Sequence, residues 1–545
     1  MRLICTISLS VHNPTFIVPV SVNLLNLTMP ADKEITESLE RKLYQLIISR
    51  LDGERISDAA YRESISELAR RGICGFIIFG GEKRVVRRFI EEIQSIPEVP
   101  LFIASDVERG VGQQIRGATL FPCQMALAAA VDAGNPEDVA LLRRAVGAIA
   151  DEAKDVGLNM LLIPVLDVNR NPDNPIICTR AFSDDPEDVA WFGSEYIDIL
   201  ENSGIISCAK HFPGHGDTSA DSHMTLPVID KTYKDLMETD VMPFTKAIRR
   251  GVGSIMVGHL SVPALDSRPA SLSRKISTDL LRADLGFDGL VITDALNMNA
   301  LKDVGKVSVE CLKAGADILL HPIDPHITVK ELMYAVESGE IAMEQIEAAE
   351  DRILRAKTRL KKAEKSDIDY SAHERLSSRM TDMSISLLKD AAGLLPIRDK
   401  REVPVIFAGD GEMYKSSPLK KHFEKCCSLQ GAAEKSPHIS TLETGETDAR
   451  YFSALFAIFT SVSAWKGSSG ISEADRNGIH NLMKKAEHSI VISFGSPYVL
   501  RHFKEADILI AAYEPTEQAQ RSVLKCLEGL LDFQGRLPVK IEWSE

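Results

Sequence analysis

The sequence lacks several features that mark common protein classes. Its 545 residues contain no run of about 18 consecutive apolar residues, so no membrane-spanning helix is expected. Lysine and arginine form no cluster and the net charge is -15, which argues against nucleic acid or an anionic membrane as partner. Internal repeats and low-complexity tracts are absent. The composition, 44% apolar and 26% charged, is typical of a soluble globular protein with two or more domains.

Cysteine is sparse and odd in number. The nine cysteines are scattered singly through apolar runs, apart from Cys426-Cys427, and no C-x-x-C spacing occurs. This pattern favours buried free thiols in a reducing compartment over a disulfide framework. The predicted location is therefore the cytoplasm.

The first 28 residues lack a clean apolar core and a small-residue cleavage site. Met29-Pro30 then leads directly into a predicted helix. We expect the true start to be Met29, and residues 1–30 to be a poorly defined tail. A degenerate export signal is the alternative interpretation.

Short apolar runs alternate with amphipathic helical stretches through the first part of the chain. The runs are Gly75–Phe79, Leu101–Ala104, Met160–Leu166, Ile205–Ala209, Ser254–Val257, Leu290–Thr293 and Asp317–Leu320. Such alternation predicts parallel strands with crossover helices. Seven runs over roughly 300 residues suit a (β/α)8 barrel with one strand missed. Ahead of them, the spacing of Leu39, Leu43, Leu46 and Ile47 predicts a helix over residues 37–51.

A second α/β unit follows the charged helix predicted at Met343–Lys362. Its strands are expected at Val403–Ala408, Tyr451–Phe459, Ser489–Phe494 and Asp507–Ala512, with a late turn and strand at Gly535–Val539. The predicted division is a barrel over residues 31–365, a linker over 366–380 and a smaller domain over 381–545.

Each barrel run is followed by a polar or charged side chain. These residues are Asp106, Asp167, Lys210-His211, His259, Asp294 and His321. Barrel active sites are built at the C-terminal ends of several strands. We therefore expect a shared rim, although any one of them alone could simply end a strand.

The densest cluster of polar residues is the loop Lys210–Asp230, in which glycine and proline bend the backbone so that polar side chains converge. Within it, Asp221-Ser222-His223 can set its two outer side chains on the same side. A carboxylate that accepts a hydrogen bond from one imidazole nitrogen raises the basicity of the other, which suits proton transfer. A surface pair without a role is the alternative.

Three further candidates lie outside the dyad. Asp294, just past an apolar strand, suits a nucleophile or a stabiliser of positive charge, or else the N-cap of a helix. Asp106 can accept sugar hydroxyls and Arg180 can donate to them, unless both lie on solvated loops. A zinc or di-metal site could be formed from His211, His215, Asp217, Asp221 and His223.

Four motifs together resemble the glycoside hydrolase family 3 β-N-acetylhexosaminidases, the NagZ-like branch. They are KHFPGHGDTSADSH, LVITDALNM, ASDVERG and NRNPDNPIICTRAF. The resemblance runs from about Leu39 to Ala356 and more weakly through the second domain. The first motif is highly specific and the others moderately so.

The resemblance implies a (β/α)8 TIM-like barrel followed by a smaller α/β sandwich domain, with no metal or other cofactor. Asp294 would be the nucleophile that forms a covalent glycosyl-enzyme, and His223, held by Asp221, the acid/base. An imidazole pKa near 6.5 suits both roles. The sugar-binding positions would be Asp106, Arg180, Lys210 and His211. Departures at Cys178-Thr179 and Val107–Gly110 are expected to alter the shape of the sugar pocket.

The predicted function is that of a retaining exo-β-N-acetylglucosaminidase acting on peptidoglycan-recycling fragments or chito-oligosaccharides. Three tryptophans give little material for a long aromatic platform, which favours a pocket. The only expected partner is a small carbohydrate. The alternatives are a phosphorylase of the same family, a β-glucosidase, a metal-dependent hydrolase and a non-enzymatic sugar-binding barrel.

Overall fold

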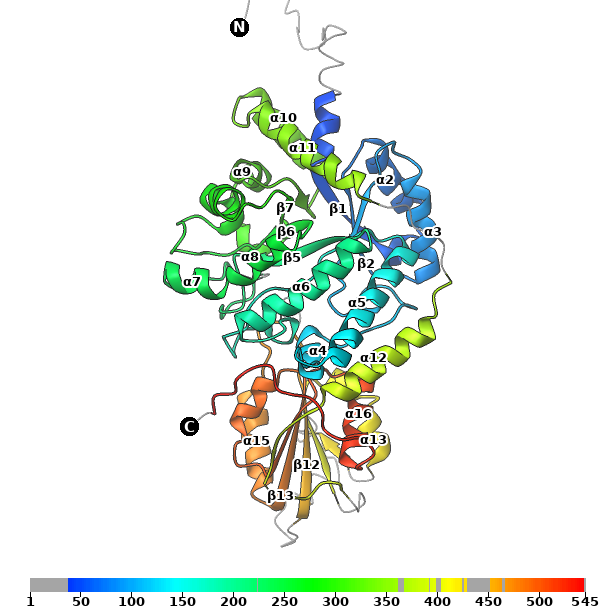
Figure 1. Ribbon diagram of the computed structural model, residues 1–545, viewed down its shortest axis with the longest axis vertical. Coiled ribbons are helices and arrows are strands. Elements are labelled where there is room, and N and C mark those ends of the chain that lie inside the picture. Colours follow the sequence, from blue (N-terminus) through cyan, green and yellow to red (C-terminus); the bar gives the residue numbers. More distant parts are fainter. Residues whose placement is uncertain are drawn as a thin grey trace, which may run out of the picture.

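Two sheets organise the chain, one in each of two lobes stacked along the long axis (Figure 1). The computed structural model describes residues 38–222, 224–360, 367–391, 393–397, 403–423, 426–428, 451–462 and 466–543. None of the helices in these ranges is long and apolar enough to cross a lipid bilayer.

The first sheet has eight parallel strands in the order β7-β6-β5-β4-β3-β2-β1-β8. They are β1 (Ile47–Asp52), β2 (Gly75–Phe79), β3 (Phe102–Ser105), β4 (Met160–Leu161), β5 (Ile206–Phe212), β6 (Ser254–Val257), β7 (Leu290–Thr293) and β8 (Leu319–Leu320). A bridge between Ile292 and Ile318 links β7 to the residue before β8, so the sheet nearly closes on itself. The predicted (β/α)8 barrel is confirmed.

The eighth strand, which the sequence did not reveal, is β1. The predicted helix over residues 37–51 is wrong in its second half, because helical structure ends at residue 44 and Ile47 begins the strand. Ile48 pairs with Gly75 of β2 on one side and with Leu320 of β8 on the other. The strand reads IISRLD, so Ser49, the exposed Arg50 and Asp52 interrupt its apolar residues, while Ile47 continues the helical spacing of Leu39 and Leu43.

Helices cover the outside of the barrel (Figure 1). They are α2 (Ala59–Arg70), α3 (Lys83–Gln94), α5 (Pro136–Val156), α6 (Pro186–Asn202), α7 (Tyr233–Thr239), α8 (Met242–Arg249), α9 (Val307–Ala314), α10 (Pro325–Glu337) and α11 (Met343–Thr358). The short, buried helix α4 (Gln124–Ala130) instead lies at the junction with the second lobe and packs against it (Figure 1). Helices α5 and α6 each begin with a side-chain cap, from Asn135 and Asp185, followed by proline.

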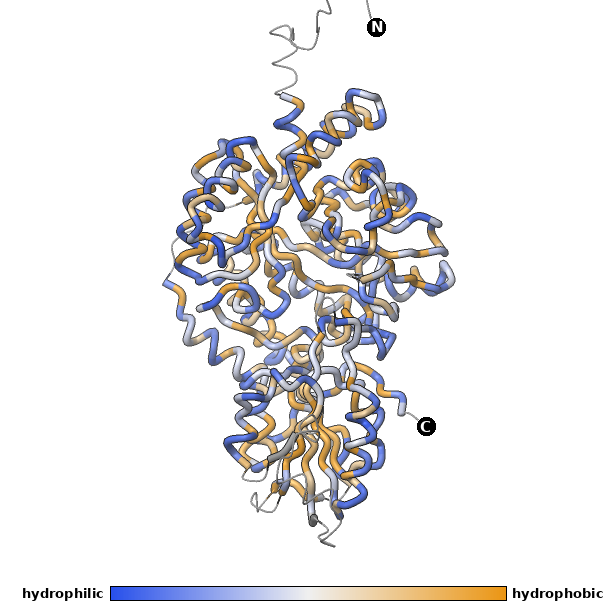
Figure 2. The backbone as a smooth tube through the Cα atoms, turned by 180° about the vertical axis from the view of Figure 1, so that it is seen from behind, coloured by the Kyte–Doolittle hydropathy of each residue, from blue (hydrophilic) through white to orange (hydrophobic). Residues whose placement is uncertain are grey.

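The second sheet has six strands in the order β11-β10-β12-β13-β14-β9. They are β9 (Ser386–Asp390), β10 (Val405–Gly409), β11 (Cys426–Ser428), β12 (Tyr451–Phe459), β13 (Ala486–Phe494) and β14 (Ile508–Ala511). Helix α15 (Glu473–Met483) lies on one face, and α13 (Pro418–His422) and α16 (Glu517–Leu527) on the other (Figure 1). Figure 2 shows hydrophobic strands between more hydrophilic helices. The α/β sandwich is confirmed.

The outer strands of this sheet escaped prediction. β9 runs antiparallel to β14, whereas the other strands pair in parallel. Gly535–Val539, predicted as a strand and described in full, is not one. The amide of Gly535 donates to the carbonyl of Ile385, and that of Arg536 donates to the carbonyl of Ala129 in the barrel. The segment therefore connects the two lobes instead of extending the sheet.

Helix α12 (Tyr370–Ser384) lies where the linker was predicted. His373 Nδ1 lies 2.8 Å from Oε1 of Glu152, and the Tyr370 hydroxyl donates to Asp155 over 2.8 Å. Both partners belong to α5. The connection between the lobes is therefore a helix fastened to the barrel by buried and half-buried polar contacts.

Candidate active site

A pocket of about 640 Å³ lies where the C-terminal ends of both sets of parallel strands meet. From the barrel it is lined by Asp106, Asp294 and His321, which follow β3, β7 and β8, and by Lys210 and His211, which lie in the last residues of β5. The second domain contributes Thr460 and Ser461 after β12, Gly495 after β13, and Tyr513 and Glu514 after β14. Carboxyl ends of parallel strands are the usual place for a site in either architecture.

Five of the predicted rim residues therefore line one shared pocket. Asp167 and His259 are fully buried and lie behind the pocket lining. Asp167 contacts His211, while the ring of His259 contacts Ser271 and the carbonyl of Ala295, next to Asp294. These two residues support side chains of the pocket from behind.

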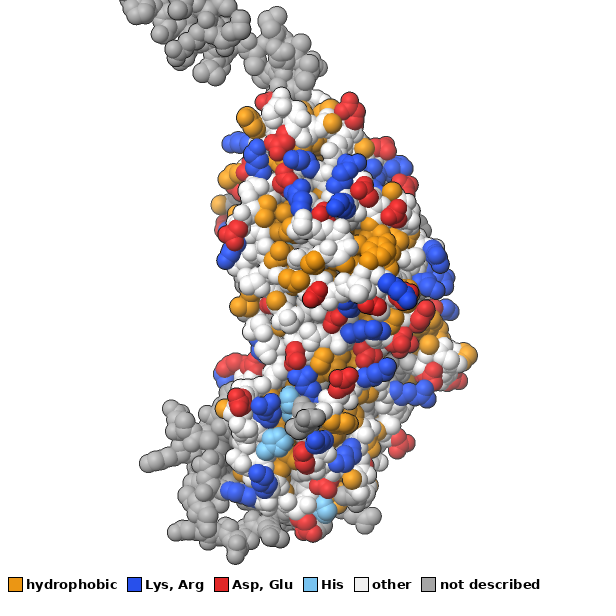
Figure 3. Space-filling view, turned by 90° about the vertical axis from the view of Figure 1, so that its left-hand side faces the viewer, with side chains coloured by type: hydrophobic (Ala, Val, Ile, Leu, Met, Phe, Trp, Pro, Cys, Tyr) orange, Lys and Arg blue, Asp and Glu red, His pale blue; other side chains and the backbone are white. Residues whose placement is uncertain are grey.

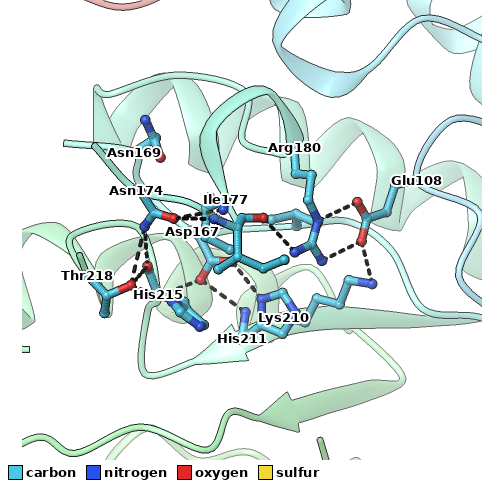
Figure 4. Close-up of polar contacts among 12 residues, drawn as sticks. Glu108, Asp167, Asn169, Asn174, Ile177, Arg180, Lys210, His211, His215 and Thr218 are labelled. Carbon is cyan, nitrogen blue, oxygen red and sulfur yellow. Dashed lines mark hydrogen bonds and ion pairs between the residues drawn. The ribbon is translucent and has the colours of Figure 1, made fainter. Parts of the chain in front are cut away.

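Alternating charges occupy one wall of the pocket (Figure 4). Nζ of Lys210, which is buried, lies 2.6 Å from Oδ1 of Asp106 and 2.7 Å from Oε1 of Glu108. Arg180 donates from Nε and Nη2 to the two oxygens of Glu108, each over 2.8 Å. The Glu108 carboxylate is thus shared by two cations, a geometry typical of strong charge-assisted contacts.

The acidic and basic groups in this wall stabilise one another's charged forms. Burial alone would raise the pKa of Glu108, but Arg180 and Lys210 outweigh it and hold that pKa well below its usual range. Burial alone would lower the pKa of Lys210, but Asp106 and Glu108 hold it above its usual range. Glu108, Arg180 and Lys210 are therefore ionised at neutral pH. The predictions did not single out Glu108, although it stands in the quoted motif ASDVERG.

Asp167 orients two histidines. Its carboxylate accepts hydrogen bonds from the amide (3.1 Å) and Nδ1 (2.7 Å) of His211 and from the amide of His215 (2.7 Å). Burial would raise the pKa of Asp167, but the two histidines hold it below its usual value. Because a carboxylate only accepts, Nδ1 of His211 carries a proton. Its Nε2 is left for the pocket.

The glycines of this loop allow a close backbone approach. A Cβ on Gly216 would lie 1.9 Å from the carbonyl oxygen of Val168, and Gly214 has φ 131°. Asn174 joins this loop to the one that carries Arg180, since its Nδ2 donates to the carbonyl of His215 over 2.9 Å. The two loops form one unit.

The second domain holds the Arg180 loop in turn. Tyr498 donates its hydroxyl to the carbonyl of Asn169 over 3.0 Å and accepts from Nδ2 of the same residue over 2.9 Å. The hydroxyl of Ser469 donates to the carbonyl of Asn174 over 2.9 Å. Sequence patterns gave no signal for these contacts, because the partners lie about 300 positions apart.

Asp294 follows β7 and is half-buried at the pocket wall. Its amide donates to the carbonyl of Val257 over 3.0 Å, and its Oδ1 accepts from the amide of Ala295 over 2.8 Å. The next helical turn of the described chain begins after Met298. The interpretation of Asp294 as a helix N-cap is therefore wrong, and the carboxylate is oriented at the strand end.

Asp221 is buried, and its carbonyl accepts from the amides of Met224 and Thr225, which makes a turn. The intervening Ser222 lines the pocket. His223 lies outside the described residues, so the Asp221–His223 dyad stays a prediction.

The candidate metal ligands have other partners. His215 Nδ1 lies 2.8 Å from the hydroxyl of Thr218, and Asp217 lies 3.0 Å from Nζ of Lys231. Within the described ranges, no group of three or more histidine, cysteine, aspartate or glutamate side chains is arranged to hold a metal ion.

The two departures noted in the sequence lie at the boundary between the lobes. Arg109 Nε lies 2.9 Å from Oε1 of Glu514, which also accepts from the amide of Cys123 over 2.6 Å. Cys178 is buried with φ 39°, a left-handed conformation that glycine adopts more easily. Arg109 and Thr179 line the pocket, whereas Cys178 packs among apolar residues of the second domain.

Comparison with known proteins gives the family. Residues 38–356 match the glycosyl hydrolase family 3 N terminal domain. A β-hexosaminidase A of Pseudoalteromonas piscicida is 34% identical over 57% of this chain, which spans 57% of that relative. A β-N-acetylglucosaminidase/β-glucosidase of Cellulomonas fimi is 28% identical over 83% of this chain and 85% of its own length. The structure of a family 3 β-N-acetylglucosaminidase from Paenibacillus is 29% identical, covers 93% of this chain and 99% of its own, and has a TM-score of 0.77. The chain belongs to glycosyl hydrolase family 3.

Proposed function

We propose that this protein is a retaining exo-β-N-acetylglucosaminidase. It hydrolyses terminal β-linked N-acetylglucosamine, carried on peptidoglycan-recycling fragments or chito-oligosaccharides. One observation carries the proposal: Asp294 opens into the same pocket as Asp106, Arg180, Lys210 and His211. A carboxylate beside a set of fixed hydroxyl-binding groups suits glycoside chemistry. The names of the Pseudoalteromonas and Cellulomonas relatives support the same substrate class.

Asp294 acts as the nucleophile in this proposal. One of its carboxylate oxygens bonds to C1 of the sugar as the bond from C1 to the leaving oxygen breaks. The hydrogen bond from the Ala295 amide to Oδ1 keeps the carboxylate in one orientation. The covalent glycosyl-enzyme then reacts with water, and the bond from C1 to Asp294 breaks. Two inversions at C1 give net retention.

His223 acts as acid and then as base. It donates a proton to the leaving oxygen in the first step and takes one from water in the second, while Asp221 orients it. The ordinary imidazole pKa, near 6.5, lets one group perform both tasks near neutral pH. A neutral imidazole also avoids repulsion with the anionic Asp294.

Asp106, Arg180, Lys210 and His211 bind the sugar hydroxyls. Asp106 accepts from hydroxyls, and the two cations donate. Because Glu108 compensates both cations, they keep their charge and position without a ligand. A pocket of about 640 Å³ that is covered by the second domain is suited to a terminal sugar and not to a long chain. This supports exo action.

The first experiment is hydrolysis of 4-nitrophenyl N-acetyl-β-glucosaminide by the wild type, Asp294→Ala and His223→Ala. We expect both variants to lose kcat/KM by orders of magnitude, and a chelator to leave the wild type unaffected. An unimpaired Asp294→Ala would contradict the nucleophile. Loss of activity with chelator, restored by zinc, would favour a metal-dependent hydrolase. Binding of sugar without turnover by the wild type would favour a non-enzymatic barrel.

β-Glucosidase activity is the second candidate, since the name of the Cellulomonas relative joins both activities. Comparing 4-nitrophenyl β-glucoside with the N-acetylglucosaminide measures the preference. The same assays with inorganic phosphate test phosphorolysis, which would yield N-acetylglucosamine 1-phosphate. A phosphate-dependent rate would change the proposal to a phosphorylase.

We further propose a reducing, cytoplasmic location. Six cysteines among the described residues, including Cys74 and Cys311, are free and buried, as expected in a reducing compartment. The surface also bears on possible partners: acidic and basic side chains are interspersed over the face in Figure 3, and that face shows no basic patch for nucleic acid. Fractionation of the native host with antibodies would test the location, and recovery of the protein outside the cytoplasm would contradict it.

A further inference from the structure

The two ring nitrogens of His215 have different surroundings. This buried residue lines the pocket beside His211, with ring centroids 5.9 Å apart (Figure 4). Its Nδ1 contacts the hydroxyl of Thr218, whereas Nε2 has no hydrogen-bond partner in the described part of the chain. Buried polar atoms nearly always have a partner, so this nitrogen requires an explanation.

Thr218 sets the tautomer of His215. The Thr218 hydroxyl lies 3.1 Å from the carbonyl oxygen of His215, which can only accept, so it donates its single proton there. Nδ1 must then donate its own proton to Oγ1 of Thr218. In the opposite tautomer the hydroxyl would turn to Nδ1 and give up its bond to the carbonyl, and the buried N–H at Nε2 would have no acceptor among the described residues. We therefore assign an unprotonated Nε2 with a free lone pair.

The imidazole stays neutral under ordinary conditions. Burial lowers the pKa of His215 to about 4, against the smaller opposing effect of the Asp167 charge. Hydrogen bonds also fix the backbone of His215 on both sides of the ring. Its amide donates to Asp167 over 2.7 Å, and its carbonyl accepts from Asn174 over 2.9 Å. Nε2 is thus a preorganised hydrogen-bond acceptor in the pocket wall.

We propose that Nε2 of His215 accepts a hydrogen bond from the substituent at C2 of the bound sugar and so contributes to substrate specificity. The donor is the amide N–H of an acetamido group or, in a glucoside, the C2 hydroxyl. The inference rests on the proposed function, in which Asp294 bonds to C1. Asp294 and His215 line the same pocket, and C2 is the substituted carbon next to C1.

The test compares kcat/KM of the wild type, His215→Leu and His215→Gln on three 4-nitrophenyl β-glycosides: the N-acetylglucosaminide, the glucoside and the 2-deoxyglucoside. Leucine removes the acceptor, and glutamine can set its amide oxygen near the position of Nε2. We expect His215→Leu to lose about 10-fold on the two substrates with a donor at C2 and less than about 3-fold on the 2-deoxyglucoside. His215→Gln should recover part of the loss.

Three outcomes would overturn the inference. Equal losses on all three substrates would mean that leucine disturbs the loop and not a bond to C2. Unchanged rates would mean that Nε2 meets no substrate donor. Failure of glutamine to recover activity, with both variants folded by circular dichroism, would argue for a structural role.

A separate measurement distinguishes this inference from the proposed function. Calorimetric binding of N-acetylglucosamine and of 2-deoxyglucose needs no turnover. His215→Leu should weaken the first about 10-fold and leave the second within about 3-fold. If the wild type bound both sugars equally and cleaved the N-acetylglucosaminide, the inference would fail while the function stood. If it bound N-acetylglucosamine through His215 but cleaved no glycoside, the function alone would fail.

Discussion

Nζ of Lys210 lies 2.7 Å from Oε1 of Glu108, and the same carboxylate binds Arg180 through both oxygens. One buried anion therefore holds in place two cations that come from different strand ends of the barrel. Its removal should affect both the stability of the fold and the pocket.

Glu108→Gln should lower the free energy of unfolding by about 3 kcal/mol and kcat/KM at least about 10-fold, because Arg180 loses its carboxylate partner and the buried Lys210 loses one of its two. A carboxyl whose pKa is depressed in the fold contributes stability above its unfolded pKa and loses it as pH falls toward the folded value. Urea titrations should therefore show the gap between wild type and variant closing below about pH 4. Glu91→Gln, on the exposed side of α3, is the control and should change neither quantity. A constant gap across pH would contradict the charge argument.

Gly216→Ala should destabilise the protein by about 3 kcal/mol, since its Cβ would meet the carbonyl oxygen of Val168 at 1.9 Å. The same change should reduce activity, because the loop carries His215. Gly147→Ala is a matched control within α5, where an added Cβ meets nothing within 4 Å. It should stabilise by about 0.5–1 kcal/mol. Thermal unfolding of both variants measures the difference in stability between them. Equal effects would mean that the loop moves and so removes the clash between the new Cβ and the Val168 carbonyl.

Arg109 and Glu514 should be energetically coupled across the two lobes. A double-mutant cycle on Arg109→Ala and Glu514→Ala should give a coupling of about 1 kcal/mol in urea unfolding, because the contact is largely shielded from water. The exposed pair Arg116–Glu54 within the barrel is the control and should show no resolvable coupling. Additive effects of Arg109 and Glu514 would mean that the pair does not connect the lobes.

Two buried histidines should make the fold sensitive to acid. Burial lowers the pKa of His215 and of His321 to about 4, with the Arg50 charge also acting on His321. A histidine whose pKa is depressed contributes stability above its unfolded pKa, near 6.5, and that stability is lost as pH falls toward 4. Unfolding free energy should decline over that range by on the order of 3 kcal/mol for His215. The double variant His215→Leu/His321→Phe should flatten the decline, and an unchanged slope would contradict the assignment.

Neither of these histidines should set the fall of kcat/KM on the acid side of the pH profile. Both are neutral above about pH 5, so neither gains or loses a proton near neutral pH, as the proposed acid/base must. His321→Gln should therefore leave the midpoint of the acid limb of kcat/KM unchanged. A shift of that midpoint by about one pH unit or more would assign the limb to His321.

Much of the barrel could be predicted because its strands are short apolar runs with capped helices between them. Asn135 and Asp185 begin their helices as their local sequence requires. The polar residues Asp106, Lys210, His211, Asp294 and His321 do meet in one pocket, since strands that run in parallel end at the same edge. β1 was missed because Ser49 and the exposed Arg50 interrupt its apolar residues, while Ile47 continues the helical spacing of the residues before it.

What the sequence by itself determined is thus local: where strands stop, how helices start, and which loop needs glycine. The tertiary structure alone decided that Glu108 and not Asp167 lies between Lys210 and Arg180, that Asp167 and His259 lie behind the pocket, and that Glu514 reaches Arg109 from the second domain. Contacts between residues far apart in the chain leave no periodic signal in either segment. Those of Glu108, Asp167 and His259 exist only once the barrel strands assemble, and that of Glu514 with Arg109 only once the two sheets set their C-terminal edges against each other.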